Sequence, residues 1–148
     1  MRRTLPGVLI AVFVVLVATA LVATAPAFAH HGFTTYFDHT KCFTMTGIQS
    51  GIIWENPHAY VKMDVKDASG KTVQWRLEMV TPNALRRNGS PREAFLANEG
   101  KSITARACPI REGGTAYAGA AEYLKLSDGL LRIVGQNMEK IEPAQLGF

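Results

Sequence analysis

Alternation of apolar and polar side chains in three successive segments constrains the fold of this chain more than any other feature of its sequence. The segments are KCFTMTGIQSGIIW (41–54), HAYVKMDVKD (58–67) and TVQWRLEM (72–79). A period of two is typical of strands that bury one face, and ASGK (68–71) has the composition of a hairpin turn. Gly47 and Gly51 indicate a bulge in the first strand. We therefore predict a three-stranded meander. The residues expected to face its core are Ala59, Val61, Met63, Val65, Val73, Trp75, Leu77 and Met79.

The rest of the chain predicts two short helices followed by further strands. TPNALRRNG (81–89) offers Thr81 as a helix N-cap, and SPREAFLANEG (90–100) offers a capping box of Ser90 and Glu93. Strand patterns return in KSITARACPI (101–110), TAYAGAAEYLKL (115–126) and LLRIV (130–134). This order predicts an all-β fold over residues 41–135, a small five- to six-stranded OB-like barrel with the short helices inserted between strands three and four.

The two cysteines support that topology. Cys42 lies on predicted strand one and Cys108 on predicted strand four, and these strands are neighbours in an OB-like barrel. Alternation places both side chains on the outward face. An even number of cysteines in an exported protein usually forms disulfides, so we expect a Cys42–Cys108 bridge, with two free thiols or a metal-binding role as the alternatives.

The N-terminal segment has the three parts of a secretory signal peptide. Arg2 and Arg3 precede an apolar run over residues 8–23, and APAFA (25–29) supplies a small-x-small cleavage box. We expect residues 1–29 to be removed, which gives a periplasmic or secreted protein with no membrane span. The alternative is an uncleaved anchor that tethers the same domain to a membrane. Residues 30–40 then form an irregular histidine-bearing arm, and residues 136–148 form a loose C-terminal tail.

The charge of the chain excludes nucleic acid as an expected partner. There are 16 Lys and Arg residues against 12 Asp and Glu. Without Arg2 and Arg3 the balance is 14 against 12, a net charge of +2, and the basic residues are scattered among acidic ones.

Several segments resemble a known family of short exported bacterial proteins, designated domain of unknown function 6152. They are the Ala-His-His sequence at 29–31, TMTGIQSGIIWENPHAY (44–60), TPNALRRNG and LANEGKSITARA (96–107). The most specific element is a Trp-x-Asn-Pro-His motif, here Trp54, Asn56, Pro57 and His58, together with the pair His30 and His31. The resemblance spans roughly residues 29–126. It implies an exported all-β domain with a recurring set of histidines, and it implies no activity.

The four histidines of the chain, at positions 30, 31, 39 and 58, all lie within the first 29 residues after the predicted cleavage site. Cleavage after Ala29 makes His30 an N-terminal residue, which offers both its α-amine and its imidazole to a metal. His58 follows an Asn-Pro turn that fixes the local backbone. An all-nitrogen ligand set suits copper. We therefore expect a copper site formed by His30, His31 and His58, with His39 as an auxiliary ligand.

The same histidines could also have roles that involve no metal. A histidine beside a cleavage site is often part of an exposed arm, and a histidine after Asn-Pro often caps a turn. The alternative function is a metal-free periplasmic interaction module that binds a protein, peptide or glycan on its barrel face. That face would contain Trp54, Asn56, Tyr60, Lys62 and Arg76. No nucleophile elbow or paired carboxylates indicate a hydrolase, and an oxygen-activating copper enzyme would need a broader substrate surface, so catalysis is not expected.

Overall fold

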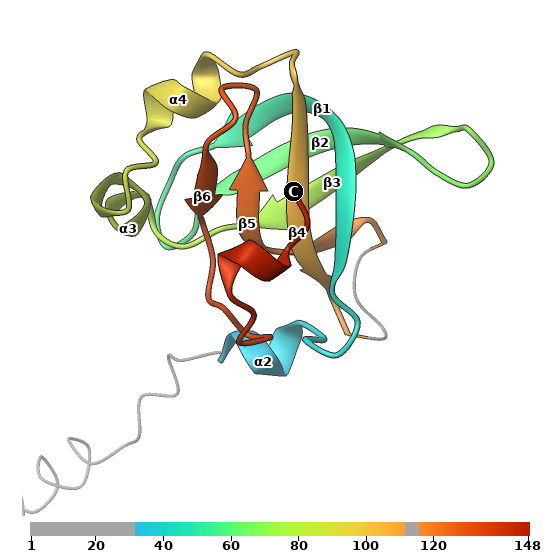
Figure 1. The fold of residues 1–148 in the computed structure, drawn as a ribbon, viewed down its shortest axis with the longest axis horizontal. Helices are drawn as coiled ribbons and strands as arrows, with labels where there is room; N and C mark the ends of the chain where they lie inside the picture. Colours follow the sequence, from blue (N-terminus) through green and yellow to red (C-terminus); the bar gives the residue numbers. More distant parts are fainter. Residues whose placement is uncertain (1–31, 112–115) are drawn as a thin grey trace, which may run out of the picture. The chain divides into compact units, whose positions relative to one another are not determined.

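The computed structural model describes residues 32–111 and 116–148. The predicted signal peptide and the pair His30 and His31 lie outside these residues. The described chain contains six strands in one sheet (Figure 1). They are β1 (Phe43–Ile53), β2 (Tyr60–Lys66), β3 (Thr72–Glu78), β4 (Ser102–Pro109), β5 (Ala118–Lys125) and β6 (Leu131–Ile133).

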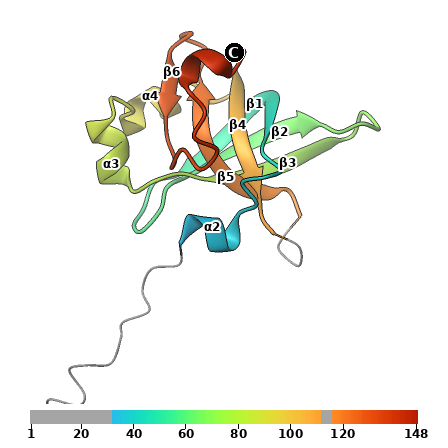
Figure 2. The ribbon, with the colours of Figure 1, turned by 60° about the horizontal axis from the view of Figure 1, so that its bottom comes forward.

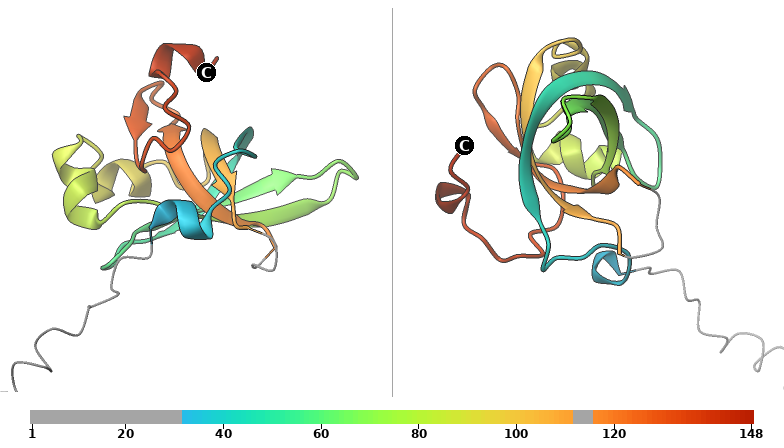
Figure 3. Two further views of the ribbon diagram at one scale, coloured as in Figure 1. Left: turned by 90° about the horizontal axis from the view of Figure 1, so that it is seen from below. Right: turned by 90° about the vertical axis from the view of Figure 1, so that its right-hand side faces the viewer.

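Five of these strands close into a barrel, which confirms the predicted OB-like architecture. The sheet order is β3-β2-β1-β4-β5-β6, and β3 pairs in parallel with β5, with Arg76 opposite Ala118 and Glu78 opposite Ala120. That pairing joins the two ends of the five-stranded sheet, and β6 is added on the far edge of β5. The view along the barrel in Figure 3 shows β1 curving around it.

β1 reaches around the barrel because its two halves pair with different strands. Residues 43–48 pair with β4, and residues 48–53 pair with β2. The predicted bulge is present, since the register with β2 shifts between Gln49 and Gly51. At Gly47 a Cβ would lie 2.5 Å from the carbonyl oxygen of Asp64, so only glycine lets β2 approach this closely.

The core lies inside the barrel and follows the predicted alternation. Ala59, Val61, Met63, Leu77 and Met79 are fully buried. Val73 is also buried, whereas Val65 and Trp75 are only partly covered. The sequence pattern did not identify Gln49, which is completely buried at the bulge. Its amide nitrogen donates to the Phe95 carbonyl oxygen at 2.7 Å and its amide oxygen accepts from Asn98 at 3.3 Å, so a polar network closes this end of the core.

Two short helices, α3 (Pro82–Arg87) and α4 (Arg92–Leu96), lie between β3 and β4 as predicted. The Thr81 cap is confirmed, because its hydroxyl accepts from the Ala84 amide at 3.2 Å. The predicted Ser90–Glu93 capping box is wrong. Pro91 occupies the N-cap of α4, and the Ser90 hydroxyl is buried without a hydrogen-bond partner among the described residues. The Ser90 amide donates to the Leu85 carbonyl oxygen at 2.9 Å, which holds Ser90 in the turn after α3, and α4 begins one residue later than predicted.

The expected irregular arm contains a one-turn helix, α2 (Phe33–Tyr36), which lies against one end of the barrel (Figure 2). Phe33 and Phe37 form a second small core with Cys108 and Ala120. Cys108 does point away from the barrel core, but this cluster covers it completely. The tail contains a 3-10 turn, η1 (Pro143–Gln145), and the Tyr123 hydroxyl donates to the Ile141 carbonyl oxygen at 3.0 Å.

Within the described part of the chain, no helix combines the length and apolar character required to cross a bilayer.

Candidate functional site

The His58 ring is oriented by two oxygen atoms beside its Nδ1. Its Nδ1 lies 3.3 Å from the Met79 carbonyl oxygen and 3.4 Å from a carboxylate oxygen of Glu78. Because a carbonyl oxygen only accepts hydrogen bonds, Nδ1 carries the proton and donates. The Nε2 lone pair is then left for another partner. A metal-binding histidine commonly has this arrangement, with its second nitrogen held by a carbonyl or a carboxylate.

The backbone around His58 is held by the two residues that follow β3. The Met79 amide donates to the Ala59 carbonyl oxygen at 2.8 Å, and the Ala59 amide donates to the Val80 carbonyl oxygen at 3.3 Å. These bonds fix Ala59, which lies between His58 and β2. The His58 side chain is 35% exposed, so its ring is partly supported and still accessible.

The N-terminal arm passes beside His58. The Phe33 ring lies 5.9 Å from the His58 ring in an edge-on arrangement, and it also lies 5.3 Å from the Phe37 ring. Phe33 itself is buried. The described chain therefore begins, at Gly32, one residue before a contact with the predicted ligand.

His39 lies in the turn after α2 and is not brought to His58 by any hydrogen bond or ring contact. Its Nδ1 is buried and has no hydrogen-bond partner among the described residues. Its carbonyl oxygen lies 3.5 Å from the Cys42 sulfur. Across residues 32–111 and 116–148, neither His39 nor His58 belongs to a group of three or more potential metal-binding side chains.

The residues of the proposed barrel face differ in their environments. Trp54 packs toward the core, with its ring 5.7 Å from Phe95, while Asn56 is exposed in the turn. On β2 and β3 the Arg76 guanidinium carbon lies 3.9 Å from the centre of the Tyr60 ring, and the Tyr60 hydroxyl donates to Glu78 at 3.2 Å. Burial and the Glu78 charge raise the pKa of Tyr60. Lys62 stands directly opposite Arg76 in the register.

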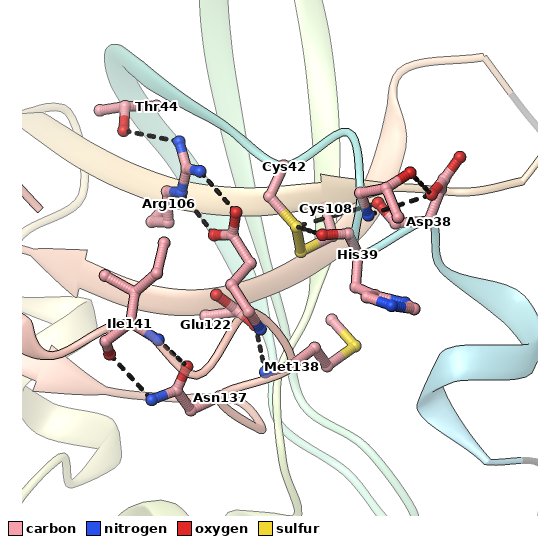
Figure 4. A network of polar contacts seen from close by, with 12 residues as sticks. Asp38, His39, Cys42, Thr44, Arg106, Cys108, Glu122, Asn137, Met138 and Ile141 are labelled. Carbon is pink, nitrogen blue, oxygen red and sulfur yellow. Dashed lines mark hydrogen bonds and ion pairs between the residues drawn. A yellow bond between two sulfur atoms is a disulfide. The ribbon is translucent and has the colours of Figure 1, made fainter.

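Cys42 and Cys108 form the predicted disulfide. Phe43 pairs with Ala107 in the β1–β4 register, so the two cysteines occupy the next opposed positions. In the described chain there is no free cysteine. The bridge lies beside two acidic residues that the sequence pattern did not identify, Glu139 and Glu122, the second of which is labelled in Figure 4. The two sulfurs and one oxygen of each carboxyl group all lie within 4.8 Å of one another.

The two acidic side chains have different environments. Both carboxylate oxygens of Glu139 accept from the Arg106 guanidinium, at 2.7 Å each. Glu122 is only 1% exposed, and one of its oxygens accepts from the backbone amides of Met138 and Glu139. Its other oxygen is buried without a hydrogen-bond partner among the described residues. Burial, with a smaller effect of the Glu139 charge, raises the pKa of Glu122.

A family model matches residues 17–119, which is more than half of the chain. The chain belongs to the family described as Family of unknown function (DUF6152). The DUF6152 match includes His58 and both cysteines, whereas Glu122 and the tail follow it. This confirms the resemblance seen in the sequence. No curated protein and no solved structure matches the chain significantly.

Proposed function

We propose that this DUF6152 protein is exported and binds copper, with His30, His31 and His58 as ligands. The observation that carries the proposal is the orientation of His58. Its Nδ1 donates to Met79 and lies beside Glu78, which leaves Nε2 as the free nitrogen. An imidazole held in this way is already in the tautomer that a metal requires, so little ordering is needed on binding.

The path of the arm supports participation of His30 and His31. Phe33 packs against His58, and His30 precedes Phe33 by three residues. Three residues of extended chain span at most about 10 Å. A terminal amine at His30 is therefore within reach of the His58 ring in a cleaved chain. The amine and ring of His30 would supply two nitrogens, and His58 and His31 would complete a roughly square-planar set.

His39 is the auxiliary ligand in this proposal. Its buried Nδ1 lacks a hydrogen-bond partner in the described chain, which leaves one ring nitrogen available. Among the described residues no hydrogen bond or ring contact joins it to His58, so we propose a smaller contribution to affinity from His39 than from His58.

Copper(II) titration of the chain that begins at His30 tests this function. We expect one copper(II) ion per chain and a His58→Ala affinity at least about tenfold lower, since one nitrogen ligand is lost. His39→Ala is the matched histidine control and should change the affinity less. Unchanged binding in the His58→Ala protein would refute this ligand set.

The alternative function is an interaction module that uses the outward face of β2 and β3. The stacking of Arg76 on Tyr60 and the neighbouring Lys62 favour it, because two cations and an aromatic ring on one face suit an anionic or carbohydrate partner. An Arg76→Ala protein that still binds copper normally would show that this face is independent of the metal site.

A further inference from the structure

We propose that the Cys42–Cys108 disulfide is redox-active and undergoes thiol–disulfide exchange with a dithiol. In this reaction Glu122 donates a proton to the Cys108 sulfur, which is the leaving group. This activity is separate from copper binding, because it uses cysteine and glutamate side chains and no histidine. Three features support it: the position of the bridge, the burial of the neighbouring carboxyl group and the unequal exposure of the two cysteines.

The Glu122 carboxyl group lies where it can donate a proton to a sulfur of the bridge. It is nearly fully buried, one oxygen has no hydrogen-bond partner among the described residues, and it lies within 4.8 Å of both sulfurs. That separation is short enough for one water molecule to relay a proton. A bridge with only a structural role would be surrounded at lower cost by apolar side chains, because an unpaired buried polar atom is unfavourable.

Burial, and less strongly the charge of Glu139, favours the acid form of Glu122 by raising its pKa. The groups that face it are Glu139, whose negative charge opposes ionisation, and Arg106, which is already engaged by both oxygens of Glu139. The tail amides of Met138 and Glu139 bind only one oxygen of Glu122. The other oxygen of Glu122 has no hydrogen-bond partner among the described residues, and one oxygen of this carboxyl group lies within 4.8 Å of both sulfurs.

The two cysteines of the bridge differ in solvent exposure, and this difference decides which sulfur the dithiol attacks. Cys108 is completely buried, whereas Cys42 is only partly buried. A thiolate of the dithiol attacks Cys42, the sulfur-sulfur bond breaks, and its electron pair goes to Cys108, which takes the proton from Glu122. The second thiol of the dithiol then ionises. It attacks the first sulfur of the same dithiol, which is bonded to Cys42 in the mixed disulfide. Cys42 leaves as a thiolate and is protonated by solvent, and Glu122 regains a proton from solvent. One protein disulfide and one dithiol become one protein dithiol and one disulfide.

Reduction of the native oxidised chain by dithiothreitol, with a chelator to remove copper, tests the proposal. Thiols are counted by alkylation and mass spectrometry as a function of time. Glu122→Gln keeps the shape and the acceptor oxygen for the tail amides but cannot donate an acidic proton. We expect it to be reduced at least about tenfold more slowly than the wild type. Glu93→Gln, the same change on the exposed surface of α4, should have no effect.

Two further readouts separate proton donation from a structural effect. In denaturant the wild type and Glu122→Gln should be reduced at equal rates, because the carboxyl group is then no longer beside the bridge. In the native wild type, the rate constant per dithiothreitol thiolate should fall as pH rises and Glu122 ionises, which requires no variant. Equal native rates for the wild type and Glu122→Gln, or a wild-type rate constant independent of pH, would overturn the proposal.

Discussion

At the scale of single residues, the sequence predicted what depends on local order and missed what depends on distant partners. His58 and the two cysteines were identified from turn chemistry and alternation. Glu122 was assigned only to a strand, because its neighbours Glu139 and Arg106 are brought to it by the tail and by β4. Gln49 was likewise missed, since its partners Phe95 and Asn98 come from a helix and loop about fifty residues away.

The raised pKa of Glu122 predicts a particular pH dependence of stability. The folded state holds this proton more tightly than the unfolded chain, so the stabilisation is fully present below the unfolded pKa of about 4.3 and is lost as pH rises through the folded pKa. Glu122→Gln cannot ionise. The unfolding free energy of the variant should therefore rise relative to the wild type as pH rises from about 4.3 through the folded pKa of Glu122, with a slope of at most about 1.4 kcal/mol per pH unit. Urea titrations at several pH values measure it, and parallel curves would contradict the assignment.

At the scale of elements, the alternation and the turns predicted the strand boundaries. The residue at which each helix begins depended instead on which of several neighbouring residues occupies the N-cap. The six strands lie within the predicted segments. Thr81 forms its cap because Pro82 can occupy the first helical position. Ser90 also carries a hydroxyl group and precedes a proline, but the helix begins after Pro91 and leaves the Ser90 hydroxyl buried. The one-turn α2 has no periodic signal and forms through the packing of Phe33 and Phe37.

The two hydroxyl residues before these helices form a matched pair for mutation. Thr81→Ala removes a real cap and should lower the unfolding free energy by about 1 kcal/mol. Ser90→Ala removes a buried hydroxyl that has no partner, so its effect should be close to zero or stabilising. Chemical denaturation of both variants provides the comparison. An equal loss in the two proteins would show that the capping assignment is wrong.

At the scale of the whole molecule, barrel closure was predictable and the covering of its outer face was not. The order of strands and helices leads to the OB-like arrangement, and the disulfide agrees with the β1–β4 pairing. The N-terminal arm and the tail both approach the bridge from its outer side, through Phe33, Phe37 and Met138. No alternation or spacing in the sequence indicates this, because each segment contributes only one or two apolar residues.

The disulfide also stabilises the molecule as a whole. Its cysteines are 66 residues apart, and for a loop of that length the chain-entropy model gives about 4 kcal/mol. The double variant Cys42→Ala/Cys108→Ala should lose roughly that amount in urea unfolding. The reduced wild-type chain is the natural control and should unfold at a similar midpoint. A loss below about 1 kcal/mol would show that the arm and tail hold β1 to β4 without the bridge.

The central claim, that cleavage creates a copper ligand at His30, is tested most directly by comparing the chain that begins at His30 with the same chain acetylated at its N-terminus. The two proteins have the same histidines, and only the acetylated one lacks a free terminal amine. Competition titration with copper(II) near neutral pH should show that the acetylated chain binds at least about tenfold more weakly, a difference of about 1.4 kcal/mol. Copper binding by the His30 chain should weaken as pH falls through about 6 to 7, since imidazoles must lose their protons to bind the metal. Equal affinities for the two chains would contradict the claim.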